Sequence, residues 1–212
     1  MYDRSKELET VIEGVRADFE AKHAAREVGL ASCRRALRNS ANAIRVVHRG
    51  DFPAAEVLLA EAGQLLESAR AALAAHPDIY HAGFVHDAQK EYAEGCTSLA
   101  LIAGRPLPKP SDIGVEYAAY LNGLGETVGE LRRHLLDRLR SGDVTYCEVC
   151  LANMDDIYSL IVTFDYPEAI TSGLRRTADA VRGILERTRG DLTLAVRQRD
   201  LERKLDEFDK RV

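Results

Sequence analysis

The amino-acid sequence predicts an all-α protein, and three observations carry the prediction. The stretches between prolines are rich in Ala, Leu, Glu and Arg, which are strong helix formers. The alternation of β-branched residues that is typical of strands is nearly absent. Prolines and Gly-Asp pairs divide the chain into segments of helical length. The sequence therefore predicts a bundle of seven helices.

Each helix boundary has a local cause. Pro53, Pro77, the cluster Pro106 to Pro110 and Pro167 each separate two helical stretches. Ser141-Gly-Asp143 and Arg189-Gly-Asp191 have the form of a helix stop followed by an N-cap. The first helix is unusually long, and we expect it to bend near Gly29. The expected helices are 3–49, 53–75, 78–103, 111–140, 143–164, 166–188 and 191–210.

Composition limits the domain organisation and the kinds of partner. No linker or shift in composition divides the chain, so we expect one domain over residues 1–212. The 29 Lys and Arg against 34 Asp and Glu give a net charge of -5, so nucleic-acid binding would need a local basic patch. No apolar run approaches the roughly 20 residues of a spanning helix, and the N-terminus lacks the apolar core of a signal peptide. We therefore expect a cytoplasmic protein with no membrane partner.

Two acidic rows are the most informative pattern. Asp87, Glu91 and Glu94 lie at spacings of four and three on one helix face, and Ser98 continues that row. Glu126 and Glu130 form a second row one helix further along. If the two helices are neighbours, the carboxylates converge into a site for Mg²⁺ or Mn²⁺, which prefer oxygen ligands.

The residues around these rows leave two alternatives open. Ala119, Asn122 and Gly123 share the face of the second row, and such small residues let another helix or a substrate backbone come close. Ion pairs of Lys90 with Glu94 and of Glu130 with Arg133 would instead make both rows ordinary charged surface.

Two further stripes run along helices. Arg34, Arg38, Arg45 and Arg49 lie within about 60° of one another on the first helix. Such a stripe is able to follow the phosphates of a nucleic acid, although the spacing alone favours a solvated amphipathic face. On the last helix Leu194, Leu201 and Phe208 recur every seven residues, with Leu205 beside them, a pattern suited to a partner helix or to packing within the same subunit.

Several short motifs of the sequence resemble those of the translin family, and within it of the translin-associated factor X branch. Lys90-Glu-Tyr-Ala-Glu-Gly95 is similar to that branch's QEYxEA motif. The segment 122–133 is similar to the family's GVADLTGEL segment, and Ser141-Gly-Asp143 follows where the family has a short helix break. The stretch that begins at Gly173-Leu-Arg-Arg-Thr177 occupies the place of the family's C-terminal helices, which form its dimers and rings.

The resemblance implies a seven-helix protein that assembles into an octameric shell, binds single-stranded RNA or DNA and cleaves RNA with a divalent metal. By position, Glu91 and Glu94 match the two catalytic glutamates of the motif. Glu126 stands where the family has a catalytic aspartate, a conservative departure, and Glu130 matches its companion glutamate. Asp87 has no counterpart. A single chain that carries the full acidic set implies a homo-oligomer.

The sequence thus predicts a Mg²⁺- or Mn²⁺-dependent endoribonuclease that acts on single-stranded RNA. Glu91, Glu94 and Glu126 would hold the metal, Glu130 would be a ligand or a base behind it, and the metal would activate water. The arginine stripe would hold the nucleic acid, because the basic, aromatic segment of translin is replaced here by residues 80–87. Two alternatives stay open: a non-catalytic oligomer that binds single-stranded nucleic acid, and, ranked lower, an all-α nucleotide pyrophosphatase.

Overall fold

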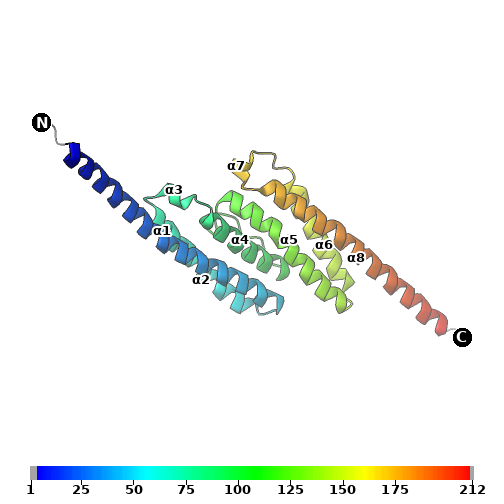
Figure 1. Ribbon diagram of the computed structural model, residues 1–212. Coiled ribbons are helices and arrows are strands. Elements are labelled where there is room, and N and C mark those ends of the chain that lie inside the picture. Colours follow the sequence, from blue (N-terminus) through cyan, green and yellow to red (C-terminus); the bar gives the residue numbers. More distant parts are fainter. Residues whose placement is uncertain (1–3, 211–212) are drawn as a thin grey trace.

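The computed structural model describes residues 4–210, which form eight helices and no strand (Figure 1). The all-α prediction is confirmed. Six of the helices are long, whereas α3 and α7 are single turns. The helices are α1 (Arg4–His48), α2 (Phe52–Leu73), α3 (Pro77–Tyr80), α4 (Phe84–Ile102), α5 (Tyr117–Arg140), α6 (Val144–Ile161), α7 (Glu168–Thr171) and α8 (Leu174–Asp209).

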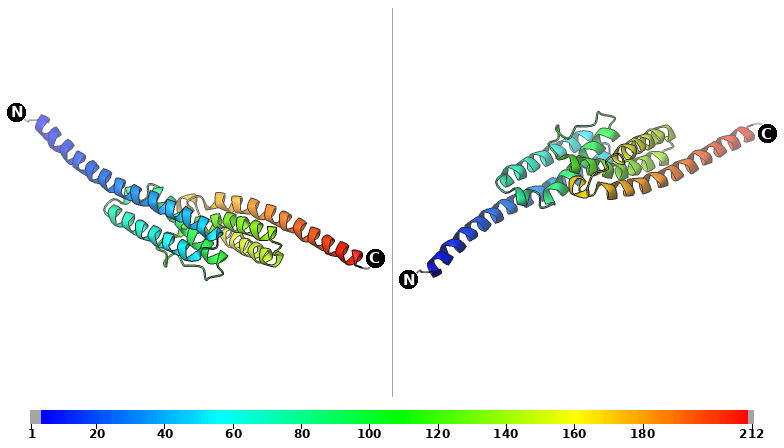
Figure 2. Two further views of the ribbon diagram at one scale, coloured as in Figure 1. Left: turned by 90° about the horizontal axis from the view of Figure 1, so that it is seen from below. Right: turned by 90° about the horizontal axis from the view of Figure 1, so that it is seen from above.

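The helices pack in a chain of neighbours, and two of them project beyond the bundle. Helix α1 packs on α2 and α4, α4 packs on α5, and α5 packs on α6 and α8. The first part of α1 and the last part of α8 extend from opposite ends of the body (Figures 1 and 2). These arms leave apolar side chains in solvent, among them Phe19 (65% exposed) and Phe208 (64% exposed). None of the described helices combines the length and apolarity that crossing a bilayer requires.

Three of the expected helices begin differently from the prediction, and glycines and prolines explain where. The expected helix 166–188 is interrupted at Ser172-Gly173, both with positive φ, so α8 begins only at Leu174. The expected helix 78–103 is divided into α3 and α4 by Gly83, whose φ of 99° is incompatible with a right-handed helix. The expected helix 111–140 begins only at Tyr117, because the proline-containing segment before it forms turns. This long connection returns the chain to the start of α4, so α4 and α5 run parallel.

The expected break at Arg189-Gly-Asp191 is wrong, since α8 continues through it. Packing outweighs the local signal here. Leu192 is buried in the core directly after the Gly-Asp pair. Arg132 of α5 pairs with Asp191 at 2.7 Å and donates a hydrogen bond to Thr188 at 2.8 Å. These contacts hold both sides of Gly190 against α5 and keep the helix continuous.

Helices α4 and α5 approach each other closely at Gly123. A Cβ at that position would lie 2.5 Å from the backbone oxygen of Lys90 and 2.9 Å from the backbone nitrogen of Glu94. One turn further on, the hydroxyls of Thr97 and Thr127 are 2.6 Å apart and fully buried. Because Gly123 has no side chain, α4 is able to pack directly against α5 beside the second acidic row.

We predict that Gly123→Ala lowers the free energy of unfolding by about 3 kcal/mol, because the added methyl meets rigid backbone of α4. Gly129→Ala is the matched control, since Gly129 is in the same helix and has open space around it. That change should be neutral or stabilise by up to about 1 kcal/mol. Urea unfolding measures both, and equal midpoints for the two variants would contradict the close packing.

Candidate metal centre

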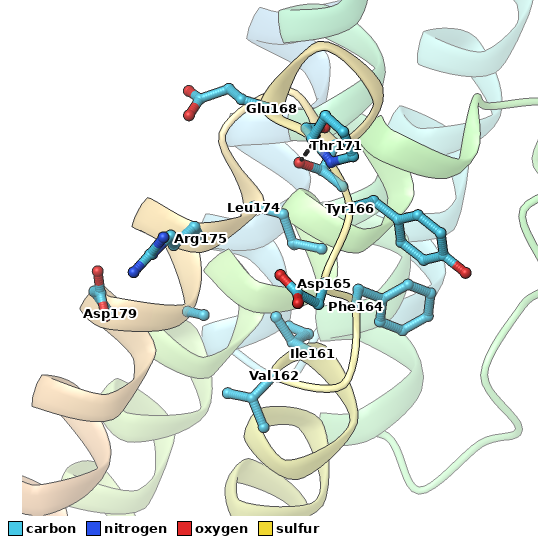
Figure 3. A pocket seen from close by; sticks show the side chains of 12 residues that line it. Ile161, Val162, Phe164, Asp165, Tyr166, Glu168, Thr171, Leu174, Arg175 and Asp179 are labelled. Atoms are coloured by element: carbon cyan, nitrogen blue, oxygen red, sulfur yellow. Dashed lines mark hydrogen bonds between the residues drawn. The ribbon is translucent and has the colours of Figure 1, made fainter.

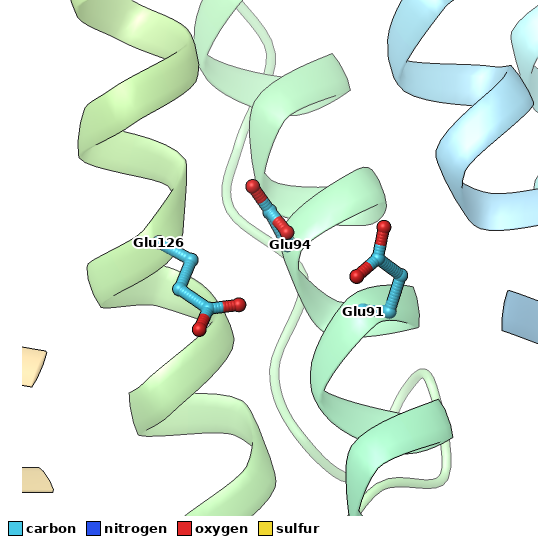
Figure 4. A group of neighbouring side chains, drawn as sticks. All are labelled: Glu91, Glu94 and Glu126. Atoms are coloured by element: carbon cyan, nitrogen blue, oxygen red, sulfur yellow. The ribbon is translucent and has the colours of Figure 1, made fainter.

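Three carboxylates from α4 and α5 converge on one point. Glu91 and Glu94 are on α4, and Glu126 is on α5 (Figure 4). Each offers an oxygen, and these oxygens all lie within 4.8 Å of one another. We call this group the carboxylate triad. Glu126 extends from α5 toward α4 in Figure 4, so the group depends on the close packing of the two helices.

The carboxylates of the triad repel one another. Glu94 is only 9% exposed, and burial together with the neighbouring charge of Glu91 raises its pKa to about 8. Burial, followed by the charge of Glu126, also raises the pKa of Glu91. Carboxylates at a solvated surface do not interact in this way. The group therefore favours any cation, proton or metal, that enters it.

One cation of the chain already lies at the triad. The ammonium of Lys90 donates a hydrogen bond to Glu126 Oε1 at 2.7 Å. The ion pair that the sequence suggested between Lys90 and Glu94 is thus made with Glu126. Asp87, the first member of the acidic row, is exposed and lies outside the triad.

Glu130 lies next to the triad and has its own partners. Its negative charge contributes to the raised pKa values of Glu91 and Glu94. It accepts a hydrogen bond from His48 Nε2, at the end of α1, and pairs with Arg133 at 3.8 Å. The hydrogen bond from His48 is the largest cause of the lowered pKa of Glu130. His48 has a side chain that is 5% exposed. Spacing along a single helix could not indicate it, because it comes from a third helix.

Two buried side-chain atoms within residues 4–210 have no hydrogen-bond partner, and both belong to this region. They are His48 Nδ1 and Ser98 Oγ. His48 is bonded to Glu130, and Ser98 is on α4 one turn after Glu94. Buried polar atoms are normally satisfied, so unmet polar atoms mark a place for water or a ligand. The three convergent oxygen donors of the triad fit a hard divalent cation.

The arginine stripe is exposed along α1. All four side chains face solvent, and none makes an ion pair with a described residue; Arg45 donates a hydrogen bond to Asn42 at 3.0 Å. Arg45 lies one turn before His48, and Arg49 directly follows His48. The end of the stripe is thus on the turn of α1 that reaches Glu130.

A separate hollow of about 790 Å³ lies between the end of α6 and the start of α8 (Figure 3). Its lining combines the apolar Ile161 and Leu174 with Asp165, Arg175 and Asp179. No residue of the carboxylate triad lines it. The convergence of three carboxylates therefore singles out the triad, not this hollow, as the candidate centre.

Fold and site together define an all-α protein with a carboxylate centre between two parallel helices. Two solved structures of AfC3PO, one of them in a complex with duplex RNA, superimpose with a TM-score of 0.82 at 35% identity. The match covers 89% of this chain and 97% or 98% of AfC3PO. The apo form of NeC3PO shares the fold, with a TM-score of 0.78 over 87% of this chain and 96% of its own, at 19% identity.

These likenesses show that the chain belongs to the translin/C3PO family. An uncharacterized protein of Methanocaldococcus jannaschii, MJ0175, is 29% identical over 176 residues, which are 81% of this chain and 76% of that protein. No model of a known protein family matches the sequence.

The raised pKa of Glu94 predicts a pH dependence of stability. The folded protein holds a proton up to about pH 8 that a glutamate of ordinary pKa, 4.5, releases much earlier. This contribution to stability is full below about pH 4.5 and is lost as the pH rises through about 8. In EDTA, the free energy of unfolding should therefore fall between about pH 5 and pH 8, and Glu94→Gln should flatten that decline.

Urea unfolding at several pH values measures this, with the exposed Glu148→Gln as the matched control. Parallel pH profiles for Glu94→Gln and the unaltered protein would show that Glu94 does not hold the proton.

Proposed function

We propose that this protein is a divalent-metal-dependent endoribonuclease of the translin-associated factor X type, acting on single-stranded RNA. The observation that carries the proposal is the convergence of Glu91, Glu94 and Glu126, the positions at which the sequence resembles the catalytic motifs of that branch. RNA as the ligand class is supported by the AfC3PO structure, which is a complex with duplex RNA.

The carboxylate triad would hold Mg²⁺ or Mn²⁺, which when bound polarises a phosphoryl oxygen and makes water more acidic. Glu130 is held beside the triad by His48, so its carboxylate would be placed to accept the proton of the attacking water. The water oxygen would bond to phosphorus as one bridging P–O bond breaks. The proton of the water would pass to Glu130, and the leaving ribose oxygen would take a proton from solvent to become a hydroxyl. The arginine stripe binds neighbouring phosphates.

The test is incubation of the purified protein with labelled single-stranded RNA in Mg²⁺, in Mn²⁺ and in EDTA. Glu91→Gln and Glu94→Gln should each reduce cleavage at least about a hundredfold, because each removes a charged oxygen ligand. Glu148→Gln should cleave normally, and parallel assays with duplex RNA and DNA define the substrate.

RNA that is bound but intact in every buffer would contradict the nuclease and favour a binding oligomer. Release of pyrophosphate from nucleoside triphosphates would favour a nucleotide pyrophosphatase. Cleavage that survives in Glu91→Gln would remove the triad from the mechanism.

We also propose that the chain forms a homo-oligomer, an octamer by resemblance, through its projecting arms. Leu194, Leu201, Leu205 and Phe208 form an apolar seam on α8 and are all more than half exposed. An apolar seam of this length is stabilised when a partner helix covers it.

Leu201→Asp should therefore lower the molar mass measured by light scattering, because it places a charge in the covered seam. Arg199→Asp, on the other side of the same helix, should keep the mass unchanged. A monomer in the unaltered protein, or an unchanged assembly in Leu201→Asp, would exclude the arm as the interface.

A further inference from the structure

Within residues 4–210, Lys90 differs from the other cationic side chains in its position at the carboxylate triad. It directly precedes Glu91 on α4, and its ammonium is 2.7 Å from Glu126 Oε1 on α5. Among the described residues, it is the one cation whose charge lowers the pKa of both Glu91 and Glu94. Two other cationic groups of this region, His48 and Arg133, instead lower the pKa of Glu130.

The same position makes Lys90 a competitor of a metal ion. A divalent ion held by all three carboxylates would share Glu126 with the ammonium, and two cations on one carboxylate repel each other. The Lys90 side chain is 28% exposed, and its four-carbon stem is flexible, so the ammonium is able to leave Glu126 without unfolding α4.

An ammonium that leaves Glu126 needs another anion. The remaining acid that acts on Lys90 from outside the cluster is the exposed Asp87, one turn earlier on α4. A phosphate of a bound nucleic acid would provide another anion at the edge of the triad, and lysine binds phosphate as a point charge.

We propose that Lys90 is a built-in counter-ion of the carboxylate triad, which a divalent ion displaces from Glu126 and whose released ammonium then binds a phosphate of the RNA. The proposal rests on the proposed function for its ligands, and it adds a coupling between them. Metal binding frees Lys90 for RNA, so each ligand strengthens the binding of the other.

The first test is Mn²⁺ binding without RNA, followed by the electron paramagnetic resonance signal of free Mn²⁺. Lys90→Gln should bind Mn²⁺ about tenfold more tightly than the unaltered protein, because the competing charge is gone. Lys90→Arg keeps the charge and should bind close to the unaltered protein. Lys109→Gln, which removes an exposed lysine from the loop before α5, should leave the affinity unchanged.

An affinity that is unchanged or weaker in Lys90→Gln overturns the counter-ion. Absence of Mn²⁺ binding in both proteins overturns it as well, together with the metal centre. Thermal melting of each variant shows whether a change in affinity comes from a change in folding.

The second test measures RNA affinity by fluorescence anisotropy, with and without saturating Mn²⁺, before cleavage is detectable. The gain in affinity on adding Mn²⁺ should be at least about threefold smaller in Lys90→Gln than in the unaltered protein and in Lys109→Gln. An equal gain in all three overturns the phosphate contact.

Neither test needs cleavage. A protein that binds Mn²⁺ and RNA but leaves the RNA intact would refute the proposed nuclease while both results for Lys90 still decide this proposal.

Discussion

The close approach of α4 and α5 at Gly123 determines the positions of the three carboxylates of the triad. Because Gly123 has no side chain, the backbone of α4 packs directly against α5, and the Thr97 and Thr127 hydroxyls bond one turn later. Since the two helices also run parallel, residues at matching heights face each other along their whole contact. This geometry brings Glu126 to Glu91 and Glu94. A wider spacing would leave three separate, solvated carboxylates.

The packing energy of the bundle maintains an arrangement that the charges oppose. Three carboxylates within 4.8 Å of one another repel, and the chain reduces the repulsion in two ways. Glu94 keeps its proton to an unusually high pH, and Lys90 neutralises Glu126. Both effects are reversible, because Glu94 is able to lose its proton and the flexible Lys90 ammonium is able to leave Glu126 when a cation of higher charge binds. Such a cluster is able to hold a metal ion, and the repulsion among its carboxylates opposes the fold that brings them together.

Local patterns predicted the fold class and the two acidic rows, because both are properties of single helices, and the resemblance to the translin family then selected Glu91, Glu94 and Glu126 from those rows. The spacing of Glu91 and Glu94 places them on one face of α4 whatever surrounds that helix. What one helix cannot encode is its neighbour in space. His48 comes to Glu130 from α1, and Lys90 bonds Glu126 across the α4–α5 contact, neither of which a spacing rule detects. The continuous α8 has the same cause, since Asp191 and Thr188 are held by Arg132 of another helix. The arms show the limit most clearly, because Leu201 and Phe208 are exposed and no described part of this chain covers them.

The most direct test of the carboxylate centre is diffraction from crystals grown with Mn²⁺, recorded above and below the manganese absorption edge. The structure predicts an anomalous peak between Glu91, Glu94 and Glu126, with the Lys90 ammonium moved away from Glu126. A map with no peak between these carboxylates, or with manganese bound only elsewhere, would contradict the assignment of this cluster as a metal centre.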